Sequence, residues 1–397
     1  MSPAAMHRQV LILAIAQAIF QTASTLVMTV GGLAGARLAG SPALATLPIA
    51  TMFLGTALMT FPASMWMARA GRRPGFVVGA LLGAAGGLIA AFGIWTDSLA
   101  LLSFGTFLVG AYQAFAQFYR FAASEVASDA FRPRAIALVL AGGIVAAFAG
   151  PWLARIGGPL LDPVYVGSFL LLALVSLLGA GALLMLHVPP PVVEAEAGGG
   201  RPWRAIVSQP SYLAALFGAV TGYGIMILAM AATPLAMVAH DHPLADAALV
   251  IQLHVLGMFV PSFFSGNLIA RFGARPVMLA GIVILAGHVL TTMTGTGFAS
   301  FASALVLLGV GWNFLYVGGT TLLTTTYTQA ERGRAQATND MAIFVVGLAC
   351  SFGAGALLDL LGWQWLNLIL LPWLAAAALV LIWQERRARR TQALASA

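Results

Sequence analysis

Ala68-Arg69-Ala70-Gly71-Arg72-Arg73-Pro74 is a short basic loop between two apolar runs, and it recurs 202 residues later as Ala270-Arg271-Phe272-Gly273-Ala274-Arg275-Pro276. A second basic loop, Arg132-Pro133-Arg134-Ala135, recurs 200 residues later as Arg332-Gly333-Arg334-Ala335. Each loop takes the same place among the apolar runs of its half of the chain. The sequence therefore indicates two repeats of one structural plan.

The composition indicates that these repeats lie in a lipid bilayer. Of the 397 residues, 60% are hydrophobic and 8% are charged, whereas soluble domains carry about 25% charge. All 19 basic residues are arginines, in excess of 12 carboxylates. They lie mostly in short loops between apolar runs, which favours a membrane over a nucleic acid as the partner. A soluble enzyme is excluded, and because no nucleophile–base set or cofactor loop occurs, we expect no enzymatic activity and no permanently bound cofactor.

The apolar runs predict an all-α membrane protein with 12 transmembrane helices in two six-helix pseudo-repeats, since a span needs about 20 mostly apolar residues. A polar linker with three consecutive prolines, residues 188–210, separates an N-terminal bundle (1–187) from a C-terminal bundle (211–397). The expected spans are 10–30, 43–67, 75–95, 98–122, 135–155, 164–187, 211–237, 245–270, 276–296, 298–326, 336–359 and 363–384.

The arginines also predict the orientation of the chain. With the N-terminus inside, 16 arginines fall in inner loops or termini and only Arg37 and Arg155 fall outside, while Arg120 lies within a span. Inner loops carry the excess of positive charge in membrane proteins. We therefore expect a multi-pass protein of the bacterial inner membrane with both termini in the cytoplasm. Two parallel six-helix repeats are typical of a transporter that alternates access to a central site.

The basic loops resemble the signature of the major facilitator superfamily, roughly G-x-L-A-D-R-x-G-R-R. The matching residues are Arg69, Gly71, Arg72 and Arg73 in the first half and Gly266, Leu268, Arg271, Gly273 and Arg275 in the second. The resemblance implies the fold of that superfamily over the whole chain, with these loops controlling conformational change. The aspartate of the signature is Ala68 in one half and Ala270 in the other, so the latch that it forms in the family is in doubt here.

Charged residues inside spans are candidates for function because burying them in lipid is expensive. Arg120 in the fourth span and Asp340 in the eleventh could form a gate or a proton-linked pair, or a fixed ion pair that holds helices together. Glu125 and Asp129 are interpreted as solvated residues at a helix end, and His288 as structural.

Two methionine and histidine pairs suggest a soft-metal site. Met226 and Met230 form the one MxxxM in the chain, and His254 and Met258 form the one HxxxM. Residues four apart share a helix face, and the expected topology places both pairs near mid-span on consecutive helices. Thioether sulfur suits Cu(I), whereas zinc prefers cysteine, histidine and carboxylate. The alternative is that these residues are ordinary core residues, because methionine packs well among apolar helices.

The positions of these pairs resemble the copper-importing, CcoA-like branch of the superfamily. The resemblance implies that Met226, Met230, His254 and Met258 bind copper as a transported substrate. It also implies that the protein supplies copper for assembly of a cbb3-type cytochrome oxidase, with copper donor or acceptor proteins as possible partners.

Three other functions remain open at this stage. Amide and aromatic residues could line a cavity for a planar organic solute, which would make the protein a riboflavin importer or a drug exporter; these residues are Gln17, Gln21, Gln113, Gln117, Tyr223, Trp312, Asn313 and Tyr316. A membrane sensor or assembly factor could bind copper without moving it, although the sequence shows no soluble signalling domain.

Overall fold

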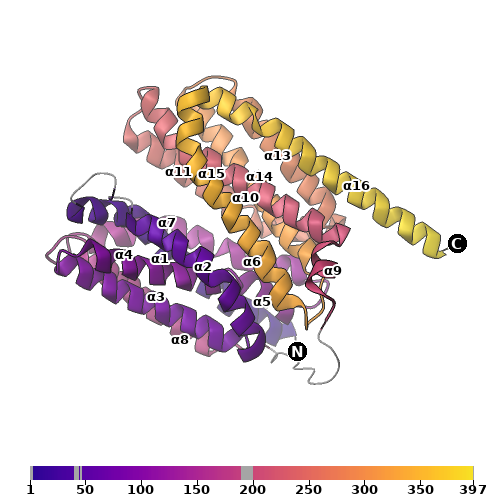
Figure 1. Ribbon diagram of the computed structural model, residues 1–397, viewed down its shortest axis with the longest axis horizontal. Helices are drawn as coiled ribbons and strands as arrows, with labels where there is room; N and C mark the ends of the chain where they lie inside the picture. Colours follow the sequence, from indigo (N-terminus) through magenta and orange to yellow (C-terminus); the bar gives the residue numbers. More distant parts are fainter. Residues whose placement is uncertain (1–2, 40–43, 45–46, 189–199, 397) are drawn as a thin grey trace. The chain divides into compact units, whose positions relative to one another are not determined.

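The computed structural model describes residues 3–39, 44, 47–188 and 200–396, and its regular secondary structure is helical throughout these ranges (Figure 1). The helices are α1 (Pro3–Leu38), α2 (Leu47–Ala70), α3 (Arg72–Trp95), α4 (Leu99–Ala116), α5 (Tyr119–Val126), α6 (Arg132–Ala141), α7 (Gly143–Gly157), α8 (Val166–Leu184), α9 (Trp203–Val207), α10 (Pro210–Ala239), α11 (Leu244–Phe259), α12 (Ser262–Phe272), α13 (Ala274–Thr292), α14 (Phe298–Leu323), α15 (Arg332–Leu368) and α16 (Leu370–Ser396). The all-α prediction is confirmed. Part of the expected linker, residues 189–199, lies outside the described residues.

Ten helical segments of the described chain are long and apolar enough to cross a membrane, or eleven if the bent pair Arg332–Ser351 and Gly353–Leu368 is one span. The difference from the expected twelve lies at the C-terminal end. The expected last span began at residue 363, directly after the non-helical turn at Gly362 (φ 72°) that divides α15, and α16 begins at Leu370. The apolar part of α16 is therefore short before Glu385, Arg386 and Arg387 add charge.

Three of the expected spans each consist of two consecutive helices. They are α4 with α5, α6 with α7, and α11 with α12. Pro261 stands between α11 and α12, where its missing N–H and fixed φ disfavour a continuous helix. Gly142 stands between α6 and α7, and a Cβ there would lie 2.5 Å from the carbonyl oxygen of Ala14 on α1. The second break thus accompanies a close helix–helix approach that only glycine permits.

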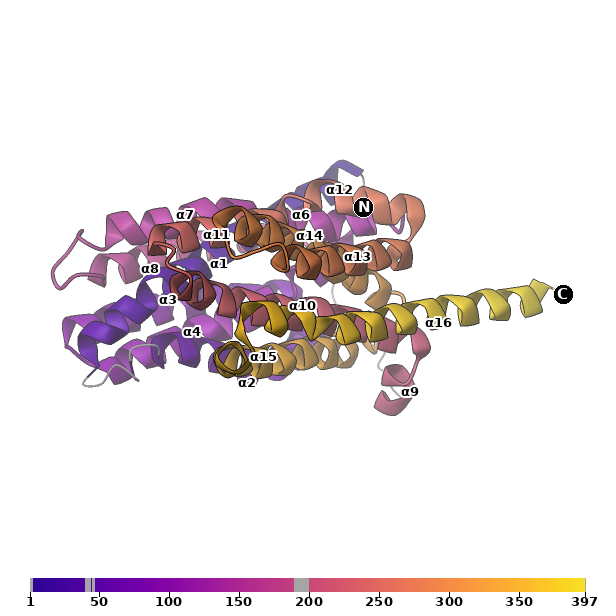
Figure 2. The same ribbon diagram turned by 90° about the horizontal axis from the view of Figure 1, so that it is seen from above.

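Contacts divide the chain into two compact units. Unit 1 contains residues 1–128, 138–198 and 332–341, and unit 2 contains residues 129–137, 199–331 and 342–397. In unit 1, α4 packs closely on α2 and α3. In unit 2, α14 packs against α10, α11 and α13, and α16 runs beside α10 (Figure 2). Helix α14 is therefore the central element of unit 2.

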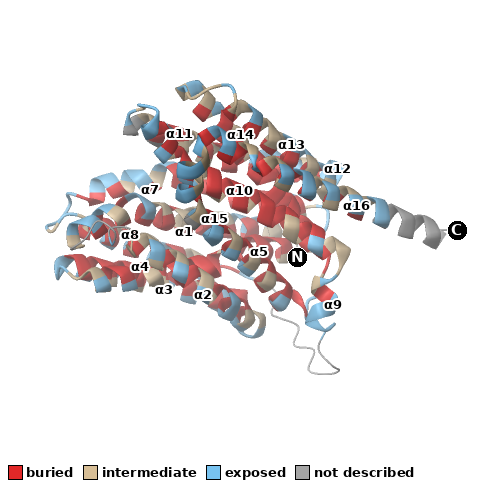
Figure 3. Ribbon diagram, turned by 45° about the horizontal axis from the view of Figure 1, so that its top comes forward, coloured by how far each residue is buried: buried red, intermediate tan, exposed pale blue. Residues whose placement is uncertain are grey.

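Small residues and apolar side chains hold the helices of each unit together. Gly257 of α11 and Gly309 of α14 permit a close crossing, because a Cβ on either would lie less than 3.0 Å from the backbone of the other helix. Buried residues gather on the faces that neighbouring helices turn toward each other (Figure 3). Large apolar side chains such as Val283 and Leu360 are exposed on the outside, as a bilayer requires.

Candidate functional site

The four expected copper ligands all belong to unit 2. Met226 and Met230 lie on α10, and His254 and Met258 lie on α11. Met226, His254 and Met258 are buried, while Met230 is half-buried. Helix α14 contacts both α10 and α11, so the two pairs lie on neighbouring helices of one unit.

The packing of α10 and α11 against α14 indicates that the methionine pair and the histidine–methionine pair lie at similar positions along the axis of α14. A Cβ on Gly309 would lie 2.6 Å from both the carbonyl oxygen of His254 and the nitrogen of Met258. On α10, Gly222 faces Leu315, and Met226 follows one turn later on the same face. Since α10 and α14 run antiparallel, Met226 is expected about one turn before Leu315 on α14, at a level close to Gly309.

His254 is the polar member of this group and has one free nitrogen. Its Nδ1 donates to the carbonyl oxygen of Leu305 at 2.9 Å, and its Nε2 is buried with no hydrogen-bond partner. An imidazole that donates from Nδ1 keeps a lone pair on Nε2. Among the described residues, no group of three or more His, Cys, Asp and Glu side chains could hold a metal ion. Any metal bound at His254 in the described part of the chain would therefore need at least one ligand of another kind, for which methionine sulfur is a candidate.

A row of five aromatic rings runs through unit 2 from α11 to α15. Trp312 and Tyr316 of α14 are stacked, with ring centroids 4.7 Å apart and an interplanar angle of 17°. Phe259 meets Trp312 edge-on at 5.9 Å. At the other end, Tyr223 lies 6.2 Å from Tyr316 and 5.9 Å from Phe344. We call these five residues the aromatic row; the sequence analysis singled out Tyr223, Trp312 and Tyr316 but missed the two phenylalanines.

Buried polar atoms without partners accompany the aromatic row. They are Nε1 of Trp312, which can donate, and Oδ1 of Asn313, which can accept. The Nδ2 of Asn313 donates to the carbonyl oxygen of Met258 and to Oγ of Ser262, both at 2.7 Å, which fixes the amide. Buried polar atoms normally have a partner, so this pair marks a place where a polar ligand would be favoured.

The amides expected to line a cavity in the first half belong to unit 1 and show a different pattern. Gln17 donates to Gln21 along α1 at 3.5 Å, and Gln117 accepts from Arg120 at 3.2 Å. Oε1 of Gln113 is buried without a partner. Gln113 is therefore the amide of this set with an acceptor available for a ligand.

Arg120 and Asp340 form a buried ion pair inside unit 1. Nη2 of Arg120 lies 2.5 Å from Oδ1 of Asp340, and both side chains are almost fully buried. Asn339 donates to the same carboxylate oxygen at 2.8 Å, and the guanidinium lies 4.6 Å above the Phe121 ring. The two residues are joined as expected, but the geometry suits both a gate and a fixed packing contact.

The first basic loop belongs to a second buried ion cluster in unit 1. Arg72 contacts Glu125 at 2.6 Å, Arg332 contacts the same carboxylate at 3.1 Å, and Gln336 accepts from Arg72. The interpretation of Glu125 as a solvated end residue is therefore wrong, because it is the shared anion between two buried arginines. Asp129, by contrast, is exposed and pairs with Arg132. Gly71, with φ of 96°, ends α2 and allows the turn into α3.

The second basic loop has the same backbone but no such cluster. Gly273 has φ of 87° and ψ of 162°, close to the values of Gly71. The spacing of 202 residues between the first loops pairs Arg72 with Ala274. The spacing of 200 residues between the second loops pairs Glu125 with Thr325. Arg69 and Arg271 are both exposed, and Arg271 lies over the Phe272 ring.

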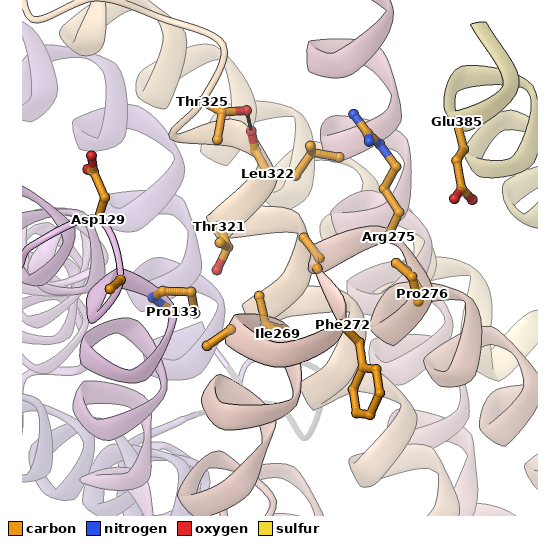
Figure 4. A pocket seen from close by; sticks show the side chains of 14 residues that line it. Asp129, Pro133, Ile269, Phe272, Arg275, Pro276, Thr321, Leu322, Thr325 and Glu385 are labelled. Atoms are coloured by element: carbon orange, nitrogen blue, oxygen red, sulfur yellow. Dashed lines mark hydrogen bonds between the residues drawn. The ribbon is translucent and has the colours of Figure 1, made fainter. Parts of the chain in front are cut away.

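In unit 2 these smaller residues line a pocket of about 550 Å³. Ala274, Thr321 and Thr325 contribute to its wall, and Figure 4 shows Arg275 and Glu385 on one side of it and Asp129 on the other. The hydroxyl of Thr325 donates to the carbonyl oxygen of Leu322. The place that holds ionic contacts in unit 1 is thus hollow in unit 2.

Comparison with known proteins identifies a family and a relative with an assigned solute. The family model of the Major Facilitator Superfamily matches residues 13–260 and 216–397 of this chain. The riboflavin transporter RfnT of Brucella anthropi is 41% identical over 381 residues, which cover 95% of this chain and 96% of the relative. The uncharacterized transporter YdeG of Bacillus subtilis is 28% identical over 91% of this chain and 88% of its own length.

Solved structures of transporters share the fold. The Major Facilitator Superfamily transporter FucP in its outward conformation superposes with a TM-score of 0.74 at 16% identity, covering 94% of this chain and 98% of the other. A bacterial homologue of the iron transporter ferroportin, in its outward-facing state, gives 0.72 at 15% identity, covering 95% and 99%. At these identities the likeness concerns the fold alone.

Proposed function

Since the chain belongs to the Major Facilitator Superfamily, we propose that it carries a planar aromatic solute of the riboflavin kind across the bacterial inner membrane into the cytoplasm. Its relatives are transporters and not enzymes. The observation that carries the proposal is the 41% identity with a riboflavin transporter over 95% of this chain. This relationship favours an organic solute, which was the alternative in the sequence analysis, over copper.

The chemistry of unit 2 supports such a solute. Riboflavin has a flat, fused ring system with hydrogen-bonding groups along one edge and a polyhydroxyl chain. Aromatic side chains stack favourably on such rings, and the aromatic row supplies five of them. The unpartnered Nε1 of Trp312 and Oδ1 of Asn313 match the mixed donor and acceptor edge of the ring. Ligand sites typically combine an apolar lining with a few such polar groups.

Uptake of radiolabelled riboflavin by a riboflavin-auxotrophic strain that lacks its own importer tests the proposal. Wild type should restore uptake, and Trp312→Ala should reduce it at least tenfold while the protein remains in the membrane. Trp365→Ala is the matched control, because Trp365 is exposed on the outside of unit 2, and it should leave uptake unchanged. Absence of uptake by wild type would overturn the proposal.

Copper import, with supply to a cbb3-type oxidase, is the second candidate. The observation that favours it is the buried, unpartnered Nε2 of His254, which lies one turn before Met258 on α11. Uptake of radioactive copper by the same cells separates the two functions. Copper accumulation that Met226→Ala and His254→Ala abolish would support this candidate. Riboflavin uptake that survives both substitutions would leave the four residues as core packing.

A further inference from the structure

The pocket of about 550 Å³ in unit 2 has one arginine and several oxygen acceptors in its wall. The wall is formed by parts of α6, α12, α13, α14 and α16 and by the loops beside them. It includes the second basic loop, which the arginine distribution predicts to be cytoplasmic. A water molecule occupies about 30 Å³ in the liquid, so the pocket has room for a molecule much larger than an inorganic ion.

Arg275 supplies the cationic donor of this wall. The side chain is half-buried in the first turn of α13, and its Nε is buried without a hydrogen-bond partner. Glu385 of α16 lies on the same side of the pocket and interacts with Arg275 electrostatically (Figure 4). Buried polar atoms normally have a partner, and a guanidinium matches the geometry of phosphate and carboxylate groups. The unpartnered Nε therefore marks a place for the anionic group of a ligand.

The other polar side chains of the wall present acceptors. Thr321 and Thr325 each donate the hydroxyl hydrogen to a carbonyl oxygen of α14, at 2.8 and 2.7 Å, which leaves their oxygen lone pairs for the pocket. Asp129 is also an acceptor, and Figure 4 shows Thr321 between it and Arg275. A ligand that fills the pocket must therefore bring hydrogen donors, such as hydroxyl groups, on the side away from Arg275.

The two carboxylates of the wall tolerate an anion because each lies near an arginine. Asp129 pairs with Arg132 at 2.5 Å, and Glu385 interacts with Arg275. Carboxylates are also regular partners of ligand hydroxyl groups, as in dinucleotide sites where an acidic residue binds a ribose hydroxyl. An arginine together with hydroxyl and carboxylate acceptors is the set of partners that a phosphorylated polyol requires.

The aromatic row offers no comparable partner for phosphate. The unpartnered polar atoms beside it, Nε1 of Trp312 and Oδ1 of Asn313, are uncharged. A phosphate placed there without a cation would carry the desolvation cost of a buried charge. The proposed solute and its phosphate ester should therefore favour different places in unit 2, the solute at the aromatic row and the ester in the pocket.

We propose that the pocket is a regulatory site for a phosphorylated polyol, and that flavin mononucleotide, the phosphate ester of riboflavin, binds there from the cytoplasm and slows uptake. The phosphate pairs with Arg275, and the hydroxyl groups of the chain donate to Thr321 and Thr325. The flat ring lies against the apolar part of the wall, which includes Ile269 and Leu322. A ligand that joins α13, α14 and α16 in this way opposes rearrangement of this end of unit 2. The choice of a flavin rests on the proposed function, while the phosphate site stands on the chemistry of the wall.

Equilibrium dialysis of the purified protein in detergent, with flavin mononucleotide as the probe, tests the site. Trp312→Ala serves as the background, so that the aromatic row contributes little to binding. Arg275→Gln should weaken binding at least tenfold, because charge-assisted hydrogen bonds to the phosphate are lost. Arg271→Gln is the matched control, since Arg271 is exposed and does not line the pocket, and it should leave the affinity unchanged. Absence of binding, or equal losses in the two variants, would overturn the site.

A second variant covers the case in which Arg275→Gln does not fold. Thr325 is exposed, so Thr325→Val should fold, and the loss of its oxygen should weaken the binding of flavin mononucleotide severalfold. Thr325→Ser keeps the hydroxyl group and should bind like the background protein. Unchanged affinity in Thr325→Val would also overturn the site.

Phosphatidylglycerol carries the same phosphate and hydroxyl chemistry in a lipid headgroup, so it serves as a competitor. Its addition to the detergent micelles should leave the affinity for flavin mononucleotide unchanged. Loss of flavin mononucleotide from the protein would assign the pocket to a lipid and overturn the proposal.

Right-side-out membrane vesicles, whose lumen faces the cytoplasmic side of the protein, test the regulation. Vesicles loaded with flavin mononucleotide should take up labelled riboflavin severalfold more slowly than empty vesicles, and Thr325→Val should abolish this difference. Equal uptake by loaded and empty wild-type vesicles would overturn the regulation. Binding of flavin mononucleotide without any riboflavin uptake would overturn the proposed function and support the phosphate site alone.

Discussion

At the residue scale, the buried pair of Arg120 and Asp340 shows how a charge can be kept inside a membrane protein. Each side chain has lost its water, and the attraction between them, with help from Asn339 and Phe121, offsets that loss. Breaking such a pair by removing one partner costs about 3–5 kcal/mol, whereas replacing both by apolar residues is often neutral. The pair therefore allows a clean test of its role.

We expect Asp340→Leu to lower the free energy of unfolding by about 3–5 kcal/mol, because Arg120 is left buried and unpaired. The double variant Arg120→Leu/Asp340→Leu should recover most of that loss. Thermal unfolding of the three proteins measures this effect, and uptake by the double variant assigns the role. Loss of uptake with stability restored supports a gate or proton-linked pair, whereas normal uptake supports a packing contact.

Glu331 offers a residue-scale prediction about pH. The hydrogen bond from Arg201 lowers the pKa of Glu331 to about 2, helped by the N–H groups of Thr328 and Arg201, while burial opposes the shift. A lowered carboxyl pKa stabilises the fold above the unfolded value of 4.5, and that contribution is lost as the pH falls from about 4.5 toward 2.

Glu331→Gln should therefore reduce thermal stability at pH 7 and remove part of the loss of stability on acidification. Melting curves between pH 7 and pH 3 check this expectation. Asp129→Asn is the control, since Asp129 is exposed and its replacement should alter neither the stability at pH 7 nor the acid profile. Equal stability of wild type and Glu331→Gln at pH 7 would contradict the prediction.

At the element scale, the two basic loops share a turn but differ in what surrounds it. Gly71 and Gly273 have nearly the same backbone angles, so the repeat in sequence is also a repeat in structure. The charges do not repeat, because Ala274 and Thr325 take the places of Arg72 and Glu125. The start of α15 is thus held in unit 1 by ionic contacts, while the corresponding part of unit 2 contains a pocket.

Restoring the missing charges should fill the pocket of unit 2. We expect Ala274→Arg and Thr325→Glu each to leave the free energy of unfolding unchanged or to lower it. The free energy of unfolding of the double variant should exceed the value expected from adding the two single effects by about 1–3 kcal/mol, as for coupled neighbouring residues. A double-mutant cycle on melting temperatures measures the coupling. If the effects of the two substitutions on stability simply add, Ala274 and Thr325 do not correspond in position to Arg72 and Glu125.

Much at this scale could be predicted from the sequence. The apolar runs located most of the membrane helices, since a run of about 20 apolar residues has few alternatives to a span. The breaks within three spans were missed. The break at Gly142, for example, accompanies a close approach of α1 that the local sequence does not reveal. The role of Glu125 was missed because its partner Arg332 lies 207 residues away, although both residues sit beside repeated loops. Nothing in the pattern marked Phe259 or Phe344 as members of the aromatic row.

At the scale of the whole molecule, the arginine distribution predicts that both termini are cytoplasmic. The single cysteine, Cys350, makes this simple to test in a Cys350→Ala background. Ala205 in α9 and Ala299 at the start of α14 are both exposed alanines, and they lie on opposite sides of the expected topology. Each is replaced by cysteine in turn.

A membrane-impermeant maleimide applied to intact spheroplasts should label Ala299→Cys at once and Ala205→Cys only after the membrane is permeabilised. The reason is that inner loops carry the excess of arginine. Labelling of Ala205→Cys in intact spheroplasts would reverse the orientation. The unsubstituted Cys350→Ala protein controls for non-specific labelling.

The pocket of unit 2 also has a consequence for binding. Its volume of about 550 Å³ falls in the range of sites that hold drug-sized molecules, about 300–1,000 Å³. Its lining includes none of the residues of the aromatic row. A molecule seated against Thr321 and Thr325 would therefore touch none of the residues proposed to hold the solute, and solute would not displace it by direct contact.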